Sequence, residues 1–136
     1  MYSVAIISDI HDWHSQQLEF NLKKKNCKVI KIKYDEIFAY FGKKKKFHFN
    51  KKLENIDGIW VRFIKSGSLE EITTKLTFLH LLEKEGIYIH NSASVIEKTV
   101  DKVRTTGLLE MNNILSPETR VHIGNIKNIK NHNNQK

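Results

Sequence analysis

Lys102 is the side chain in this sequence best placed to bind an anion. It follows a short run of β-favouring residues at 87–90 and a capping-box spacing at Ser94, which predicts a helix after that strand. Asp101 is suited to cap a second helix that carries Lys102. Open α/β sheets bind ligands beyond the carboxyl ends of their strands, where a lysine is a suitable point charge for phosphate. The alternative is an ordinary solvated lysine on a basic protein.

The loop at 9–14 is a second candidate, because it follows the first expected strand and lies near the same ligand crevice. Asp9 and His11 also form the D-x-H pattern that begins metallophosphoesterases, whose two metal ions need several further Asp, Asn and His ligands. The chain contains no G-D-x-x-D motif, and its one G-N pair, at 124–125, is followed by isoleucine. A dinuclear site therefore lacks most of its ligands, and no metal is expected to bind.

Arg62, near the end of the third expected strand, is a third candidate. A guanidinium there favours binding of a substrate carboxylate or phosphate. A structural ion pair with Asp57 or Glu70 is the alternative, and the sequence leaves both open. No Ser-His-Asp or Cys-His arrangement can be identified, so no catalytic residue is predicted.

Apolar patterning predicts an α/β fold, a Rossmann-like three-layer parallel sheet of four or five strands with helices on both faces. Short runs rich in β-branched residues mark the strands. They lie at 3–8, 27–33, 59–63 and 87–90, with a fifth, edge strand expected at 119–123. The strand at 27–33 is expected near a sheet edge. Aromatic residues on both sides of a lysine-rich turn predict a hairpin or aromatic-rich excursion within 34–50.

Helices are expected between the strands. Leu18 and Leu22 give the helix at 14–26 one buried face. The next helix opens with Ser68 and Glu71 in a capping box. Its buried stripe is expected to contain Leu69, Ile72, Leu76, Phe78, Leu79 and Leu82.

Several motifs then follow one another in a fixed order. They are SDIHDWHSQQL at 8–18, WVR at 60–62, GSLE at 67–70, LH at 79–80, HNS at 90–92, IEKTVDK at 96–102, the threonine pair at 105–106 and SPET at 116–119. Together they resemble the segment that leads into the ATP-grasp domain of RimK-like α-L-glutamate ligases, and most of all the branch that includes the tetrahydromethanopterin glutamate ligases. The resemblance spans residues 3–121, which makes it more specific than any single motif.

The resemblance implies an ATP-dependent carboxylate–amine ligase that adds L-glutamate to an acceptor. ATP would phosphorylate a carboxylate, the glutamate amine would attack the acyl phosphate, and Mg²⁺ would neutralise the phosphates. It further implies that Lys102, in the DK motif, contacts an ATP phosphate, and that Trp13 and His14 face the acceptor or the neighbouring module. The implied partners are L-glutamate and a small-molecule or peptide acceptor, and a homo-oligomer is compatible with the resemblance.

Residues 1–123 are expected to form the pre-ATP-grasp α/β domain, followed by an Asn- and Lys-rich tail at 124–136 that is expected to be disordered. Such ligases continue into two subdomains that clamp ATP, with a lysine-bearing strand, a Gly-rich loop and magnesium ligands. None of these is visible in the sequence, so we expect the ATP-grasp catalytic module to be absent. Alone, the chain should be inactive, should not bind ATP and Mg²⁺ tightly, and should expose an apolar patch where that module docks.

Charge suggests a function of another class. The chain has 136 residues, a formal net charge of +8 and a pI of about 9.5, which invites a nucleic-acid hypothesis. The lysines at 23–25 and 43–46 fall in local clusters, however, and no RNA-binding motif, zinc finger or recognition helix accompanies them. Specific nucleic-acid recognition is therefore disfavoured. A stand-alone anion- or nucleic-acid-binding module stays as the alternative function.

The remaining composition favours a cytoplasmic protein without a membrane segment. No apolar run reaches the roughly 18 residues that a spanning helix needs, and the N-terminus does not resemble a secretory signal. Cys27 is the single cysteine, so no internal disulfide can form.

Overall fold

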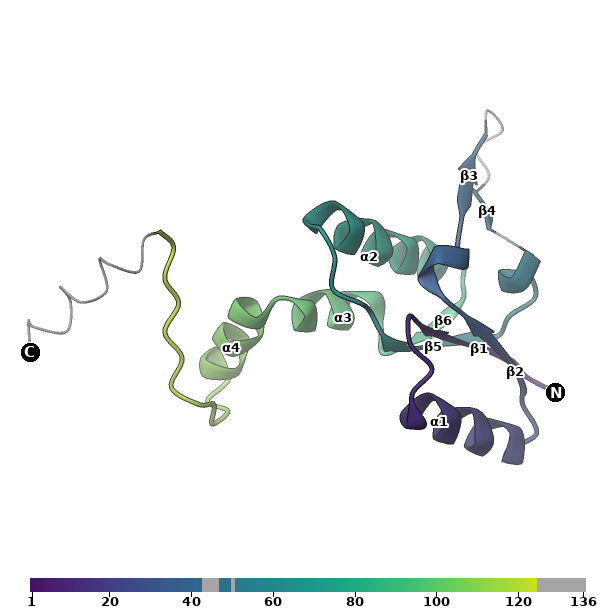
Figure 1. Ribbon diagram of the computed structural model, residues 1–136, viewed down its shortest axis with the longest axis horizontal. Helices are drawn as coiled ribbons and strands as arrows, with labels where there is room; N and C mark the ends of the chain where they lie inside the picture. The colour runs from purple at the N-terminus through teal and green to yellow at the C-terminus, as the bar shows by residue number, and fades with distance from the viewer. Residues whose placement is uncertain (43–46, 50, 125–136) are drawn as a thin grey trace, which may run out of the picture. The chain divides into compact units, whose positions relative to one another are not determined.

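The computed structural model describes residues 1–42, 47–49 and 51–124 (Figure 1). The chain forms two compact units, 1–97 and 98–136. Unit 1 contains β1 (Ser3–Ser8), α1 (Trp13–Lys24), β2 (Lys28–Ile32), the short helix η1 (Tyr34–Glu36), β3 (Ala39–Phe41), β4 (Phe47–Phe49), the short helix η2 (Lys51–Leu53), β5 (Gly58–Phe63), α2 (Leu69–Lys84) and β6 (Tyr88–His90). Helix α3 (Ala93–Val100) crosses the boundary, and α4 (Lys102–Met111) lies in unit 2.

Unit 1 is built on a parallel sheet with the strand order β2-β1-β5-β6. In the middle of the sheet, Ile6 pairs with Lys31 on one side and with Trp60 on the other. This confirms the predicted α/β fold, with four strands in the parallel sheet and β2 at an edge. The hairpin is also confirmed, because β3 and β4 pair antiparallel.

The predicted fifth strand is wrong, because residues 119–123 form no strand. They belong to unit 2, whose described part contains helix and irregular chain but no strand that could pair with them. A β-favouring run needs a neighbouring strand for its backbone hydrogen bonds, and its composition does not supply one.

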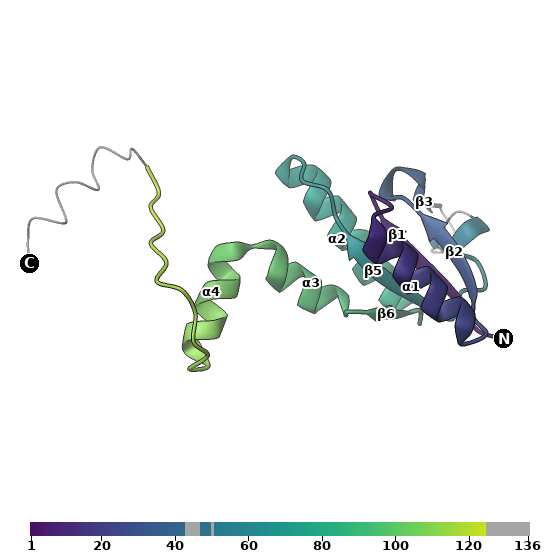
Figure 2. The ribbon, with the colours of Figure 1, turned by 60° about the horizontal axis from the view of Figure 1, so that its bottom comes forward.

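The sheet carries α1 on one face and α2 on the other (Figures 1 and 2). The reason lies in the direction of each connection. The chain moves from β1 to β2 in one direction, and from β2 to β5 and then to β6 in the opposite direction. Right-handed crossovers therefore place α1 on one face, and the hairpin and α2 on the other. The three-layer arrangement follows from the strand order.

The main core lies between the sheet and α2. Alternation along the strands directs Ala5, Ile7 and Ile59 to this face, where Leu79 and Leu82 of α2 are fully buried against them. Each fully buried Ile or Leu contributes about 1.5–3 kcal/mol relative to an exposed one. The prediction that Leu69 belongs to the buried stripe is wrong, because it is 77% exposed.

Local signals account for most helix ends. Ser68 and Glu71 form the predicted capping box of α2, with reciprocal hydrogen bonds of 3.2 and 2.8 Å. Gly86 follows α2 with a φ of +87°, a conformation that glycine adopts without strain. The helix predicted to begin near Ser94 is confirmed, because α3 begins at Ala93. Its cap is Ser92 and not Ser94, since the hydroxyl of Ser92 accepts a hydrogen bond from the N–H of Val95.

In unit 2, the predicted cap of α4 is confirmed, because the carboxylate of Asp101 accepts hydrogen bonds from the N–H groups of Val103 and Arg104. Residues 114–124 follow without helix or strand. The lysines of the hairpin turn at 43–46 and nearly all of the predicted disordered tail at 124–136 lie outside the described residues. Within the described part of the chain, every helix is too short or too polar to cross a membrane.

Candidate functional site at the carboxyl edge of the sheet

The strand order creates a switch point between β1 and β5. The connections that leave these two neighbouring strands run in opposite directions and to opposite faces. The chain after β1 and the chain after β5 therefore diverge at the carboxyl edge of the sheet. Ligands of open α/β sheets bind at this position.

Asp9 joins three elements at this edge. One carboxylate oxygen accepts a hydrogen bond from the N–H of Tyr34, just after β2, at 3.3 Å. The other accepts from the N–H of Lys65, just after β5, at 2.8 Å, and from the ammonium of Lys75 on α2 at 3.1 Å. Burial acts to raise the pKa of Asp9, but the hydrogen bonds from Lys65 and Lys75 outweigh it and lower the pKa below its usual 3.8.

Tyr34 forms the inner wall beside this ion pair. Its ring lies 5.3 Å from the ammonium of Lys75, in a cation–π contact, and the residue is only 5% exposed. Its hydroxyl is buried and has no hydrogen-bond partner among the described residues. Burial, followed by the negative charge of Asp9, raises the pKa of the Tyr34 phenol. The phenol is therefore neutral throughout the physiological range of pH.

An open cleft of about 690 Å³ adjoins these side chains. That volume lies in the range typical of small-molecule sites. Its lining combines ammonium, carboxylate, hydroxyl and aromatic groups, contributed by Asp9, Lys33, Tyr34, Asp35, Lys65, Glu70, Glu71, Thr74, Lys75 and Phe78. Groups of both charges in one cleft can bind and orient a small polar molecule.

A second cluster at the same edge contains three residues predicted from the sequence. Arg62 donates a hydrogen bond to Asp12 at 2.8 Å, and His14 lies 3.3 Å from the same carboxylate oxygen. The ring of Trp13 contacts that of His14, with 5.1 Å between centroids. The structure thus brings Trp13, His14 and Arg62 together around Asp12.

The structural partners suggested for Arg62 were wrong. Arg62 pairs with Asp12 and with neither Asp57 nor Glu70. Asp57 lies at the opposite end of the sheet, where its carboxylate accepts a hydrogen bond from the N–H of Ser3. Asp12 also caps α1 through the N–H of Ser15. That hydrogen bond has the largest effect on the pKa of Asp12, and desolvation opposes it. The hydroxyl of Ser15, His14 and the charge of Arg62 add to the lowering, and the pKa falls to about 2.

Lys102 is the first residue of α4, in unit 2. Its side chain is exposed, and the ammonium donates a hydrogen bond of 3.3 Å to the carbonyl oxygen of Thr99. Two N–H groups in the first turn of α4, those of Val103 and Arg104, already donate to the carboxylate of Asp101. An anion bound here would therefore depend on the lysine side chain more than on the end of the helix.

The D-x-H pattern in the first loop does not assemble a metal centre within the described residues, where no three His, Cys, Asp or Glu side chains converge as ligands. The oxygens of Asp9 instead accept hydrogen bonds from protein groups.

Sequence reasoning missed Tyr34, Lys65 and Lys75 as parts of the site. For Lys75 a signal was present. It lies between Ile72 and Leu79 at spacings of three and four, on the stripe of α2 that faces the core, where a lysine needs an ionic partner.

No protein-family model matches this chain, and no curated protein matches it. The resemblance to RimK-like ligases therefore rests on the sequence motifs quoted above.

Proposed function

We propose that the chain acts as the pre-ATP-grasp domain of an ATP-dependent carboxylate–amine ligase of the RimK-like kind, in the cytoplasm. In this proposal it forms one wall of the cleft in which L-glutamate is joined to a small-molecule or peptide acceptor. One observation carries the proposal. The SDIHDWHSQQL and WVR motifs are about fifty residues apart in sequence, yet Asp12 of the first contacts Arg62 of the second at the edge of the sheet where ligands bind.

The proposed roles follow from the contacts at this edge. Arg62 binds a carboxylate of the acceptor or of glutamate, and Asp12 holds the guanidinium in place until the substrate arrives. Trp13 and His14 are both exposed and line the approach to Arg62.

ATP supplies the phosphoryl group that activates the carboxylate, and Lys102 is the residue of this chain that would contact its phosphates. The exposed ammonium and its single long hydrogen bond fit that role. The described residues offer no cluster of metal ligands, so Mg²⁺ would be held by ATP and the ATP-grasp module.

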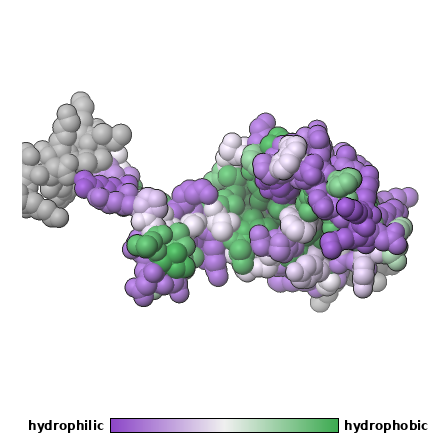
Figure 3. Space-filling view, turned by 90° about the horizontal axis from the view of Figure 1, so that it is seen from below, coloured by the Kyte–Doolittle hydropathy of each residue, from purple (hydrophilic) through white to green (hydrophobic). Residues whose placement is uncertain are grey.

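Unit 2 also carries the kind of surface that such a module would cover. Several large apolar side chains on α4 and after it are exposed, and Figure 3 shows hydrophobic surface on this unit. The most exposed are Leu115, at 101%, and Ile123, at 96%, followed by Met111, at 82%. Exposed apolar patches on a protein surface commonly mark sites of docking.

The test combines the chain with a purified ATP-grasp module from a RimK-like ligase and measures ADP release that depends on L-glutamate and acceptor. We expect release only when both parts are present. Removing a charged hydrogen bond to phosphate costs about 1.5–3 kcal/mol, so Lys102→Ala should lower the rate at least tenfold. Lys84→Ala, at an exposed lysine near the end of α2, is the matched control and should change little.

Calorimetry on the chain alone separates a partial site from a complete one. We expect no tight binding of ATP·Mg²⁺. Micromolar binding that is lost in Lys102→Ala would show a nucleotide site that works alone, and would contradict the proposed division of the site between two modules.

A further inference from the structure

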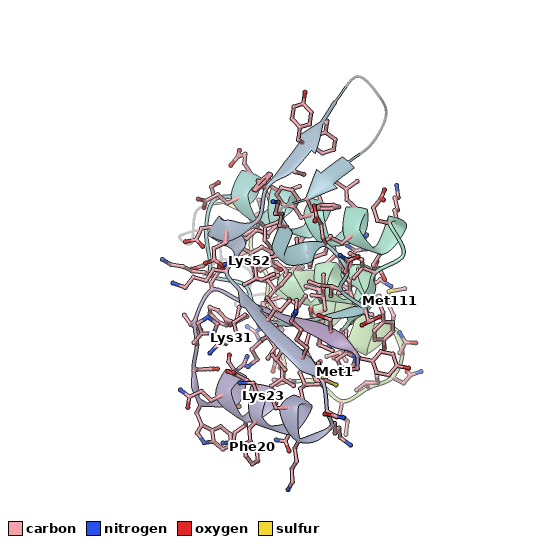
Figure 4. The ribbon with its side chains drawn as sticks, turned by 90° about the vertical axis from the view of Figure 1, so that its right-hand side faces the viewer. Met1, Phe20, Lys23, Lys31, Lys52 and Met111 are labelled. Atoms are coloured by element: carbon pink, nitrogen blue, oxygen red, sulfur yellow. The ribbon has the colours of Figure 1, made fainter. Side chains whose placement is uncertain are left out.

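Folding brings lysines of α1 and β2 together on one face of unit 1. Lys23 and Lys31 both bind the carboxylate of Glu19, at 2.6 and 3.0 Å, although they come from different elements. Figure 4 shows Phe20, Lys23 and Lys31 on this side of the molecule. We call this surface the basic face, and define it as Phe20, Lys23, Lys24, Lys25 and Lys31.

The basic face has a large excess of positive charge. Its four lysines and the carboxylate of Glu19, which two of them bind, give a formal charge of +3. Hydrogen bonds from Lys23 and then from Lys31 lower the pKa of Glu19, so the carboxylate stays ionised. It can neutralise only one of the lysines around it. The rest of the excess charge is available to a polyanion.

An aromatic ring lies among these lysines. Phe20 is 59% exposed on the outward side of α1, and the ammonium of Lys24 lies 6.0 Å from the centre of its ring. The exposed residues within one turn of Phe20 on this helix are polar, including Gln16, Gln17 and Asn21, and the other exposed ring of α1, Trp13, lies two turns away. A helix that lies in a membrane surface needs a continuous apolar face, which α1 lacks. A single exposed ring among lysines instead fits a base that stacks while its backbone phosphates contact the ammonium groups.

We propose that the basic face binds single-stranded nucleic acid without sequence specificity. The bases stack on Phe20, and the phosphates are neutralised by Lys23, Lys24, Lys25 and Lys31. This inference does not depend on the proposed ligase function, because the face involves neither the cleft beside Asp9 nor Lys102.

The test is the fluorescence anisotropy of a labelled 15-nucleotide oligouridine titrated with the whole chain. Neutralising about three phosphates of a single strand gives a salt slope near −2, so affinity should fall roughly twentyfold between 50 and 200 mM salt. Lys24→Ser with Lys25→Ser should reduce this slope by about two thirds. Phe20→Ala should weaken binding roughly tenfold at constant salt and leave the slope unchanged, because stacking is not a charge contact.

Two controls test the location. Lys84→Ser with Lys98→Ser removes the same charge from exposed lysines elsewhere, and Phe41→Ala removes a ring of similar exposure from β3. Both should leave binding within about twofold. Equal loss in these controls would overturn the assignment to the basic face. Equally tight binding of poly-L-glutamate or of anionic lipid vesicles would overturn the choice of nucleic acid, and so would an unchanged affinity in Phe20→Ala.

Discussion

Asp9→Asn tests whether one carboxylate holds the carboxyl edge of the sheet together. The substitution keeps the size and one acceptor oxygen of the side chain but removes its charge. Lys75 then loses its ionic partner in a place where its side chain is only 21% exposed, and the side chain of Asp9 itself is only 11% exposed. The N–H groups of Tyr34 and Lys65 also lose a charged acceptor.

The expected loss follows from these contacts. Breaking a buried ion pair by removing one partner costs about 3–5 kcal/mol, because the other charge stays buried. The ammonium of Lys75 keeps some access to water and its contact with the Tyr34 ring, which reduces the cost. We therefore expect Asp9→Asn to lower the free energy of unfolding by about 3 kcal/mol. Lys75→Met in the same background should recover part of this loss, because no unpaired charge is then buried.

Urea denaturation followed by tryptophan fluorescence and circular dichroism measures both changes. The matched control is Glu36→Gln, which breaks the ion pair with Lys52, where both side chains are about half exposed. Exposed pairs contribute about 0–1 kcal/mol, so the control should change stability little. If Asp9→Asn costs no more than Glu36→Gln, or if Lys75→Met recovers nothing, Asp9 does not hold this edge through its charge.

Two further predictions concern pH and a helix cap. The pKa of Asp12 is lowered from 3.8 to about 2, so its contribution to stability is fully present above about pH 4 and is lost as the pH falls toward 2. Acid titrations of the unfolding free energy should show a shallower fall in Asp12→Asn over this window. An identical slope in both proteins would contradict the stabilisation of the Asp12 carboxylate by Ser15, His14 and Arg62. Ser68→Ala removes the N-terminal cap of α2 and should lower the free energy of unfolding, measured by urea denaturation, by about 1 kcal/mol. Thr77→Ala, on the exposed side of the same helix, should lower it by less. Equal losses would show that the capping box does not stabilise the N-terminal end of α2.

The sheet could be predicted from the sequence because its signals are local. The run that becomes β1 is buried on both faces, so its sequence is continuously apolar. A short continuous apolar run is typical of a central strand in a parallel sheet. The end of α2 could be predicted for the same reason, since Gly86 adopts a conformation that other residues rarely adopt. The errors at Leu69 and at 119–123 share one cause. Residue type indicates that a side chain can be buried or that a run can pair, but it does not supply the neighbour. Leu69, at the start of α2, is 77% exposed, and the described part of unit 2 has no strand with which 119–123 could pair.

The site was predicted less completely, because it depends on contacts between distant residues. Residue type identified Arg62 as an anion-binding candidate, but its partner, Asp12, lies fifty residues away and only the strand order brings the two together. Lys75 could have been suspected from its place on a buried stripe. Its partner could not, because any of several carboxylates at the edge of the sheet was available to it.

The two aspartates of the first loop differ in a way that separates structure from binding. Asp9 pairs with Lys75 where both side chains are mostly buried, so exchanging this pair for a ligand would leave a charge without water or partner. Asp12 and Arg62 are each more than a quarter exposed, so the guanidinium can leave Asp12 for a substrate carboxylate while Asp12 stays hydrated and bonded to Ser15. A ligand that reaches this edge should therefore compete with Asp12 for Arg62 and leave the Asp9 pair intact. Asp12→Asn should then strengthen carboxylate binding at Arg62, whereas Asp9→Asn should weaken it by loosening the edge.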